Sequence, residues 1–258
     1  MKPVGDAVLK IDGIGVRFGG INALQKVDFV VGRGELVGLI GPNGAGKTTM
    51  LKTISGQVTP TEGSVWLDGR ELNGLRSVRR SRLGLAMSHQ IVRPFRNMTV
   101  LDNVALAVGK ACTASPLRAF ARVSRVKQRK EAIRLLDLVG IASVAEELPG
   151  TQPLGVLKRL EVARALAMGP SVLMLDEPLA GLNQTEANRL AETIKDVNDG
   201  GTTIILIEHN LGEAQRICDR FVVLDNGRKI ADGAVSDVMA DESVITAYLG
   251  EGWRNAKA

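Results

Sequence analysis

Apolar residues gather in three short, uninterrupted runs along the chain, at residues 36–40, 172–175 and 203–207. Runs of this length without polar alternation are typical of parallel strands that helices cover on both faces. Between the second and third runs, apolar positions recur at helical spacing over residues 190–197 and end at a Gly-Gly pair at 200–201. The pattern therefore predicts a strand–helix–strand unit in a buried parallel sheet.

A different pattern marks the two ends of the chain. Residues from about 8 to 35 alternate between apolar and polar, and 64–67 adds another short strand, so we expect an antiparallel sheet that leans on the parallel one. Apolar residues at 221–225 and 228–231 flank an Asn-Gly pair, which favours a tight hairpin turn. The tail from 235 to 249 has a helical pattern.

The middle of the chain, from about residue 92 to 168, lacks strand-like runs and is rich in helix formers. We expect an inserted helical subdomain, with a helix starting at Thr99, a break at 109–116 and an amphipathic helix over 132–139. The basic residues between 118 and 130 are compatible with a nucleic-acid patch. A solvated helix face explains them better, because only one aromatic residue accompanies them. Nucleic acid is therefore not an expected partner.

Composition sets further bounds on the class of protein. The chain has 258 residues and 45% hydrophobic content, enough for a large core, and its net charge of +5 is well short of a nucleic-acid-binding face. Cys112 and Cys218 form no disulfide framework or metal-ligand spacing, which suits a reducing compartment. The N-terminus has no leader-like apolar segment, and no window approaches about 18 apolar residues. We expect the chain to stay in the cytosol and not to cross a bilayer alone.

The run at 36–40 leads into a glycine-rich segment with the pattern Gly-x-x-x-x-Gly-Lys-Thr, followed by a plausible helix that ends near Gly56. In this setting the pattern predicts a phosphate-binding loop. Backbone N–H groups surround the phosphates, the lysine reaches the β- and γ-phosphates, and the threonine hydroxyl binds Mg²⁺. The helix start adds its positive dipole end. The predicted nucleotide-binding residues of this loop are Gly41, Pro42, Asn43, Gly44, Ala45, Gly46, Lys47, Thr48 and Thr49.

The run at 172–175 ends in two carboxylates, Asp176 and Glu177. A buried strand would deliver Asp176 to the sheet edge where Mg²⁺ held by Thr48 would lie. Because side chains alternate along a strand, Glu177 points differently, which suits a group that orients or deprotonates an attacking water. The alternative is an ordinary acidic strand end before Pro178.

Taken in order, these motifs resemble the ATP-binding subunits of ABC transporters over residues 8 to 250. The resemblance implies an α/β fold: a P-loop NTPase core with a parallel sheet, an antiparallel β subdomain and an inserted helical subdomain. We expect one ATP-binding domain over 1–258. Residues 1–91 and 169–250 would form the core with its β subdomain, 92–168 the helical subdomain and 251–258 a tail. The segments at 18–23, 39–49, 98–104, 207–210 and 247–250 look like those of subunits for branched-chain amino-acid uptake.

The resemblance also implies roles for three further residues. Phe18 occupies the position of the aromatic residue that stacks on adenine, although it could equally be a core strand residue. Gln90 resembles the glutamine that senses Mg²⁺ and the permease, the alternative being a surface glutamine. His209 resembles the histidine that contacts the γ-phosphate and helps to place the water.

The signature segment departs from the family pattern. Relatives usually read Leu-Ser-x-Gly-Gln, whereas this chain has Pro153 in place of the serine and retains Gly155. In the family this segment of one subunit caps the γ-phosphate held by the other. Proline offers neither a hydroxyl nor an N–H, so the composite site could be weakened unless Thr151 substitutes. Asn183 stands where many relatives have aspartate.

The resemblance therefore implies an ATP-hydrolysing subunit of an ABC importer for branched-chain amino acids or a related small solute, with ATP and Mg²⁺ as cofactors. Expected partners are a second ATP-binding subunit, two membrane permease subunits and, indirectly, a periplasmic or extracellular solute-binding protein. The chain would lie peripherally on the cytoplasmic face of the cell membrane. The alternatives are an exporter ATPase, a soluble ABC ATPase that acts on nucleic acid or in cluster assembly, or a weakly active nucleotide-binding partner in an asymmetric heterodimer.

Overall fold

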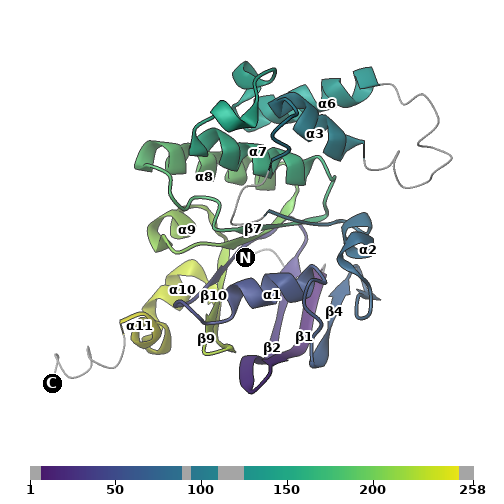
Figure 1. Ribbon diagram of the computed structural model, residues 1–258. Helices are drawn as coiled ribbons and strands as arrows, with labels where there is room; N and C mark the ends of the chain where they lie inside the picture. Colours follow the sequence, from purple (N-terminus) through teal and green to yellow (C-terminus); the bar gives the residue numbers. More distant parts are fainter. Residues whose placement is uncertain (1–6, 89–93, 110–124, 250–258) are drawn as a thin grey trace.

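The computed structural model describes residues 7–88, 94–109 and 125–249 of the chain, which form two sheets and the helices around them (Figure 1). The larger sheet has six strands in the order β10-β9-β3-β8-β7-β6. All its neighbouring pairs are parallel except β9 and β10, which form an antiparallel hairpin. Its strands are β3 (Leu36–Ile40), β6 (Leu85–Met87), β7 (Val172–Asp176), β8 (Thr203–Ile207), β9 (Arg220–Asp225) and β10 (Arg228–Ala234).

The hairpin turn and the strand–helix–strand unit follow the sequence pattern. Asn226 and Gly227 have φ angles of 45° and 76°, and such positive values at both central residues are those that a two-residue hairpin turn needs. Strands β7 and β8 are parallel neighbours, joined through α8 (Gln184–Asp199). Both predictions are confirmed.

The smaller sheet is antiparallel, with the order β2-β1-β4-β5. One of the two apolar cores lies between this sheet and one face of the larger sheet, and it includes Met50, Leu51 and Ile54 of α1. Helix α1 is therefore enclosed between the two sheets, which fixes the loop that precedes it. The elements are β1 (Ala7–Phe18), β2 (Ile21–Gly32), α1 (Lys47–Ile54), β4 (Glu62–Leu67) and β5 (Arg70–Glu71).

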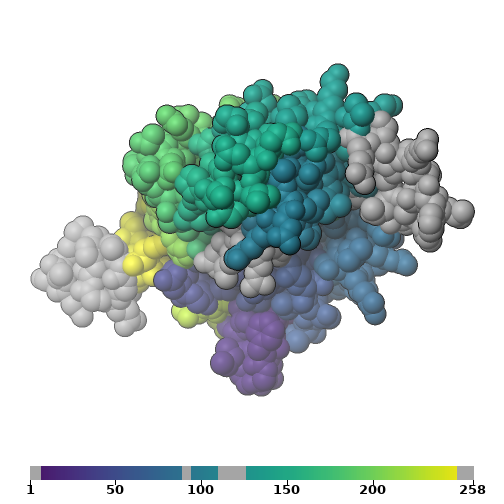
Figure 2. Space-filling view, turned by 45° about the horizontal axis from the view of Figure 1, so that its top comes forward, coloured from purple at the N-terminus to yellow at the C-terminus, as the bar shows by residue number. Residues whose placement is uncertain are grey.

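The second apolar core covers the opposite face of the larger sheet. Helices α3, α6 and α7 lie together at the top of the view in Figure 1, and the space-filling view in Figure 2 shows their surface from dark blue to green. These helices confirm the inserted helical part of the expected fold, while its limits at 92 and 168 remain a prediction. The remaining elements are α2 (Ser77–Arg82), α3 (Val100–Val108), α6 (Arg125–Leu138), 3₁₀ turns at Ala142–Val144 and Pro149–Thr151, α7 (Leu154–Leu166), α9 (Leu211–Ile217), α10 (Val235–Ala240) and α11 (Glu242–Leu249).

Two helix boundaries show how local chemistry sets the elements. The hydroxyl of Thr99 accepts a hydrogen bond of 3.0 Å from the backbone N–H of Asp102, so α3 begins where the sequence predicts. The C-terminal tail forms two helices and not one, because Asp241 has extended backbone angles and its carboxylate accepts the N–H of Ser243 at 2.7 Å. Across the described parts of the chain, no helix is both long and apolar enough to span a membrane.

Candidate functional site

The loop between β3 and α1 wraps around the ammonium group of Lys47. Lys47 Nζ donates hydrogen bonds of 2.7 Å to the carbonyl of Gly41 and 2.9 Å to that of Pro42, and the side chain is buried. Gly46 caps the helix with φ 102°, a left-handed conformation that glycine adopts without strain. The first amides of α1 have no helical carbonyl to bind and are available to an anion.

One cavity of about 210 Å³ brings the predicted phosphate-binding and hydrolytic residues together. Glu177 and His209 approach from the ends of β7 and β8, and the loop and the start of α1 form the remaining wall. The sequence placed these groups far apart, so their convergence supports the predicted site. The lining residues are Ala23, Asn43, Gly44, Ala45, Gly46, Lys47, Thr48, Thr49, Glu177 and His209.

Asp176 ends β7 on the side of the sheet that faces α1. Its neighbour Leu175 packs into the opposite core, so strand alternation turns the Asp176 side chain toward the loop. Asp176 is 3% exposed, and its N–H donates to the hydroxyl of Ser88 at 3.3 Å. Burial lowers the pKa of Lys47, and the charges of Glu177 and Asp176 oppose that change. The buried ammonium and the two carboxylates therefore share one electrostatic environment.

The oxygen groups at this edge suit Mg²⁺. The hydroxyl-bearing Thr48 lines the cavity, and Asp176 supplies a buried carboxylate at the same end of the sheet. Mg²⁺ commonly takes one or two protein oxygens and fills its other positions with phosphate and water. Within residues 7–88, 94–109 and 125–249 there is no group of three His, Cys, Asp or Glu residues that could hold a metal by themselves. Gln90, the third predicted metal-site residue, lies outside the described residues.

Glu177 stands at a strained turn directly after β7. Its φ angle is 52°, a left-handed value that costs a non-glycine residue on the order of 1 kcal/mol or more. Two hydrogen bonds to its backbone hold the turn: the N–H of Glu177 donates to Ile207 O at 3.0 Å, and its carbonyl accepts from Lys158 Nζ at 2.9 Å. In this conformation Glu177 Oε1 accepts a hydrogen bond from His209 Nε2 at 2.7 Å, so the two predicted hydrolytic groups are in direct contact.

Lys158 and Glu208 support this turn and were not among the predicted site residues. They are 6% and 3% exposed. Burial lowers the pKa of Lys158, with Glu208 the strongest opposing charge, and burial raises the pKa of Glu208 to about 7. Glu208 Oε1 also accepts the N–H of Leu179 at 2.8 Å, on the segment after Glu177. Two features of the sequence could have indicated them: Lys158 lies among apolar core positions of α7, and Glu208 directly follows the buried strand β8.

The signature residues Pro153 and Gly155 do not line this cavity. Pro153 precedes α7 with extended angles and provides no side-chain cap. A Cβ atom at Gly155 would lie 2.8 Å from Glu186 Oε1, so glycine permits close packing against the start of α8. Thr151 was the expected substitute for the missing serine. Its hydroxyl donates to Leu148 O at 2.9 Å, so its proton is already in a hydrogen bond.

Phe18 and Asn183 are both placed at the surface. Phe18 ends β1, is 51% exposed and does not line the cavity, so it is not a core residue and its ring is accessible for stacking. The Asn183 side chain accepts the N–H of Glu186 at 3.0 Å and forms a capping box at the start of α8. The side-chain amide oxygen of Asn183 therefore stabilises the start of α8.

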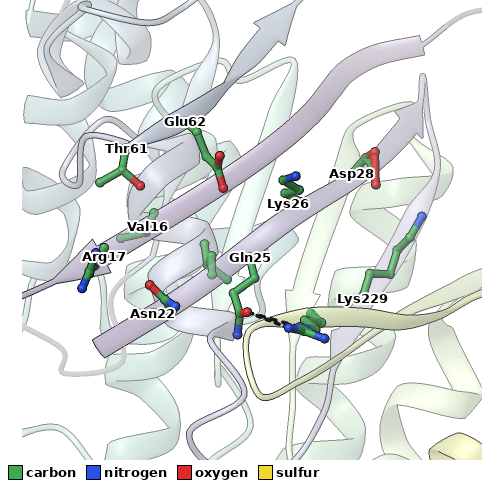
Figure 3. Close-up of a pocket in the computed structure, with 11 residues that line it drawn as sticks. Val16, Arg17, Asn22, Gln25, Lys26, Asp28, Thr61, Glu62 and Lys229 are labelled. Atoms are coloured by element: carbon green, nitrogen blue, oxygen red, sulfur yellow. Dashed lines mark hydrogen bonds between the residues drawn. The ribbon is translucent and has the colours of Figure 1, made fainter. Parts of the chain in front are cut away.

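A larger cavity of about 760 Å³ lies on the antiparallel sheet beside the β9–β10 hairpin (Figure 3). Charged and polar side chains line it, including Arg17, Lys26, Asp28 and Glu62, and Gln25 Oε1 accepts from Arg228 at 3.0 Å. None of the phosphate-loop residues contributes to its wall. Cavity size alone would therefore misplace the site that the chemistry identifies.

Comparisons with known proteins agree with this geometry. The ABC transporter family model matches residues 24–180, and the model of the branched-chain amino acid ATP-binding cassette transporter matches 228–253. The high-affinity branched-chain amino acid transport ATP-binding protein LivG of Salmonella typhimurium is 36% identical over 250 residues, covering 95% of this chain and 98% of the relative.

Two solved structures extend the comparison to the fold. A cassette of an ABC transporter in its ADP conformation has a TM-score of 0.82 at 28% identity, covering 95% of this chain and 99% of that one. A dimeric cassette in a post-hydrolysis state, bound to ADP and Pi, has a TM-score of 0.76 at 25% identity, covering 88% and 98%. The α/β P-loop fold is thus confirmed, and the chain belongs to the ATP-binding cassette family of ABC transporter ATPases.

Proposed function

We propose that Glu177 is the general base for ATP hydrolysis, that His209 contacts the γ-phosphate and places the water, and that Lys47 neutralises charge on the β- and γ-phosphates. The observation that carries this assignment is the single cavity in which the loop faces the hydrogen-bonded Glu177–His209 pair. Phosphoryl transfer depends chiefly on positioning and charge stabilisation. When ATP enters, Lys47 would exchange its contacts with the carbonyls of Gly41 and Pro42 for phosphate oxygens.

The same proposal assigns the cofactors. ATP would place its phosphates against the amides of residues 43–49 and its adenine against the exposed ring of Phe18. Thr48 and Asp176 would hold Mg²⁺, with Gln90 as a further ligand. The ion would supply charge neutralisation on the phosphate oxygens.

A second copy or a related subunit would complete the site in trans. The family includes cassettes that form dimers, and residues 153–155 would face the partner's nucleotide. One observation favours an asymmetric heterodimer: Pro153 offers no donor, and the Thr151 hydroxyl is bound to Leu148 O. A Pro153→Ser protein should hydrolyse ATP faster, by about one order of magnitude, if the lost hydrogen bond limits the composite site. An unchanged rate would indicate that other groups of the partner compensate.

A groove between the core and the helical part is suited to a permease segment. Its volume is about 510 Å³, and it lies between α2, β6, α3 and α7, beside the strand that leads toward Gln90. Val78, at 62% exposure, lies on its rim. Two permease subunits docked on two such grooves would hold the chain peripherally at the cytoplasmic face of the membrane. The walls of the groove fall on both sides of the proposed division, because α2 and β6 belong to the core and α3 and α7 belong to the helical subdomain over 92–168.

The cargo follows from relatives that transport branched-chain amino acids and from the matching C-terminal segment. We propose uptake of leucine, isoleucine, valine or a related small solute, delivered by a solute-binding protein. A strain that lacks this chain should lose uptake of the radiolabelled amino acids, and complementation should restore it. Undiminished uptake of all three would contradict this cargo.

The hydrolytic assignment is tested with Glu177→Gln, compared with Glu192→Gln on an exposed face of α8. Both proteins should bind Mg²⁺-ATP with wild-type affinity in isothermal titration calorimetry. Only Glu177→Gln should lose phosphate release, by about 10² or more, which is the usual contribution of a general base. Unchanged turnover would exclude Glu177 as the base. Absence of ATP binding by the wild-type protein would refute the proposed function as a whole.

A further inference from the structure

The C-terminal helix α11 reaches the first residue of the phosphate loop. The hydroxyl of Tyr248 accepts a hydrogen bond of 2.7 Å from the backbone N–H of Gly41, across 207 positions of sequence. Tyr248 is the only tyrosine in the chain. Helix α11 falls within the segment matched by the branched-chain cassette model. A segment with no catalytic group therefore touches the nucleotide-binding loop.

Gly41 is tightly confined at this contact. It has φ 144°, and a Cβ atom there would lie 2.0 Å from Leu224 O on β9. Its carbonyl accepts the hydrogen bond from Lys47 Nζ described above. The Gly41 residue thus links the Tyr248 phenol on one side to the Lys47 ammonium on the other, and its conformation determines where Lys47 is held.

The C-terminal part also supports the other end of the loop. The N–H of Gly227, in the β9–β10 turn, donates to Ala45 O at 3.1 Å, and the N–H of Gln25 donates to Gly227 O at 2.8 Å. Helices α10 and α11 pack on β10 and on each other, and Val238 and Val244 are buried in the core. The loop is therefore held at both ends by elements that a buried core keeps in place.

We infer that Tyr248 is a positioning residue that holds the phosphate loop in its nucleotide-binding shape, so that the C-terminal helix sets nucleotide affinity and not the rate of hydrolysis. Without the phenol oxygen, the Gly41 N–H loses its acceptor and the loop visits other conformations. Affinity then falls in proportion to the competent fraction. Glu177 and His209 follow β7 and β8 and, within the described part of the chain, make no hydrogen bond with Tyr248 or Gly41, so the chemistry of the bound complex is unaffected.

Tyr248→Phe tests the inference, because it removes only the hydroxyl. Loss of one hydrogen bond predicts a Kd for Mg²⁺-ATP that is about three- to tenfold weaker, with kcat at saturating ATP unchanged. Ser243→Ala is the control, since it removes the contact between Ser243 and Asp241 at the start of α11 and leaves Gly41 untouched. The control should lower the melting temperature without changing the Kd. Wild-type affinity in Tyr248→Phe, or a lowered kcat with unchanged Kd, would overturn the inference.

A second measurement needs no substitution at Tyr248. Protein labelled with ¹³C-tyrosine gives the signals of a single ring, and Mg²⁺-ADP should shift them because Lys47 leaves Gly41 O when phosphate binds. Lys47→Ala should show no shift at the same nucleotide concentration. Unshifted tyrosine signals in nucleotide-saturated wild-type protein would overturn the role of Tyr248. The inference rests on the proposed function, whose own failure would be distinct: wild-type protein that binds no nucleotide.

Discussion

Glu208 is expected to make the stability of the folded protein depend on pH. The side chain is 3% exposed, and burial raises its pKa from 4.5 to about 7, although Lys158 and two backbone N–H groups favour the charged form. The folded protein therefore binds a proton at Glu208 more tightly than the unfolded chain does. The difference between the two pKa values corresponds to about 3 kcal/mol.

The sign of the effect follows from the raised pKa. Between about pH 4.5 and 7 the folded state holds more protons at this site than the unfolded state, so the free energy of unfolding falls as pH rises through this window. Above about pH 7 Glu208 is charged in both states, and its contribution no longer changes. Glu208→Gln stays neutral at every pH and retains an oxygen that can accept the N–H of Leu179.

Urea unfolding at pH 5, 6, 7 and 8, followed by circular dichroism without nucleotide, measures this difference. Relative to Glu208→Gln, the wild-type protein should lose up to about 3 kcal/mol between pH 5 and 8, with little further change above pH 7. Other titrating groups cancel in the comparison, and Glu192→Gln serves as the exposed control. Parallel stability curves for wild type and Glu208→Gln, or a wild-type curve that rises relative to the variant, would refute the reasoning.

Three further substitutions give distinct outcomes. His209→Ala removes the partner of Glu177 and should lower ATP turnover by about 10² or more while nucleotide affinity, measured by calorimetry, stays near wild type; full turnover would remove His209 from the proposed mechanism. Lys158→Met deletes the donor to the Glu177 carbonyl and should reduce kcat by about one to two orders of magnitude; a change in stability with kcat intact would leave Lys158 only a structural role. Gly155→Ala should lower the free energy of unfolding by about 1 kcal/mol, because the new methyl group displaces Glu186 from its capping box. Equal denaturation midpoints for variant and wild type would show that the packing relaxes without loss of stability.

The sequence predicts what is local. The phosphate loop, the Asp176–Glu177 strand end and the hairpin turn each depend on a few adjacent residues whose backbone or side-chain chemistry is distinctive, and the structure places all three as expected. The parallel strands are recognisable because both their faces are buried, which removes polar residues from the runs at β3, β7 and β8.

Contacts between distant residues could not be predicted in the same way. Lys158 and Glu208 are separated by 50 positions, and only the packing of α7 against β7 shows that Lys158 meets the charge of Glu208 beside Glu177. The Tyr248–Gly41 contact spans nearly the whole chain. The C-terminal tail is helical, as its pattern predicts, but the pattern does not show that it is divided in two at Asp241, whose carboxylate accepts the N–H of Ser243 and begins the second helix.

The strand order has a consequence for synthesis on the ribosome. Strand β3 carries the phosphate loop and pairs only with β8 and β9, which begin at Thr203 and Arg220. Until that last fifth of the polypeptide has emerged, a fully apolar strand has both edges unpaired, a condition that favours aggregation. Nascent chains shorter than about 225 residues should therefore depend on chaperones. ATP cannot stabilise them by binding, because the phosphate loop is not yet held in a paired sheet.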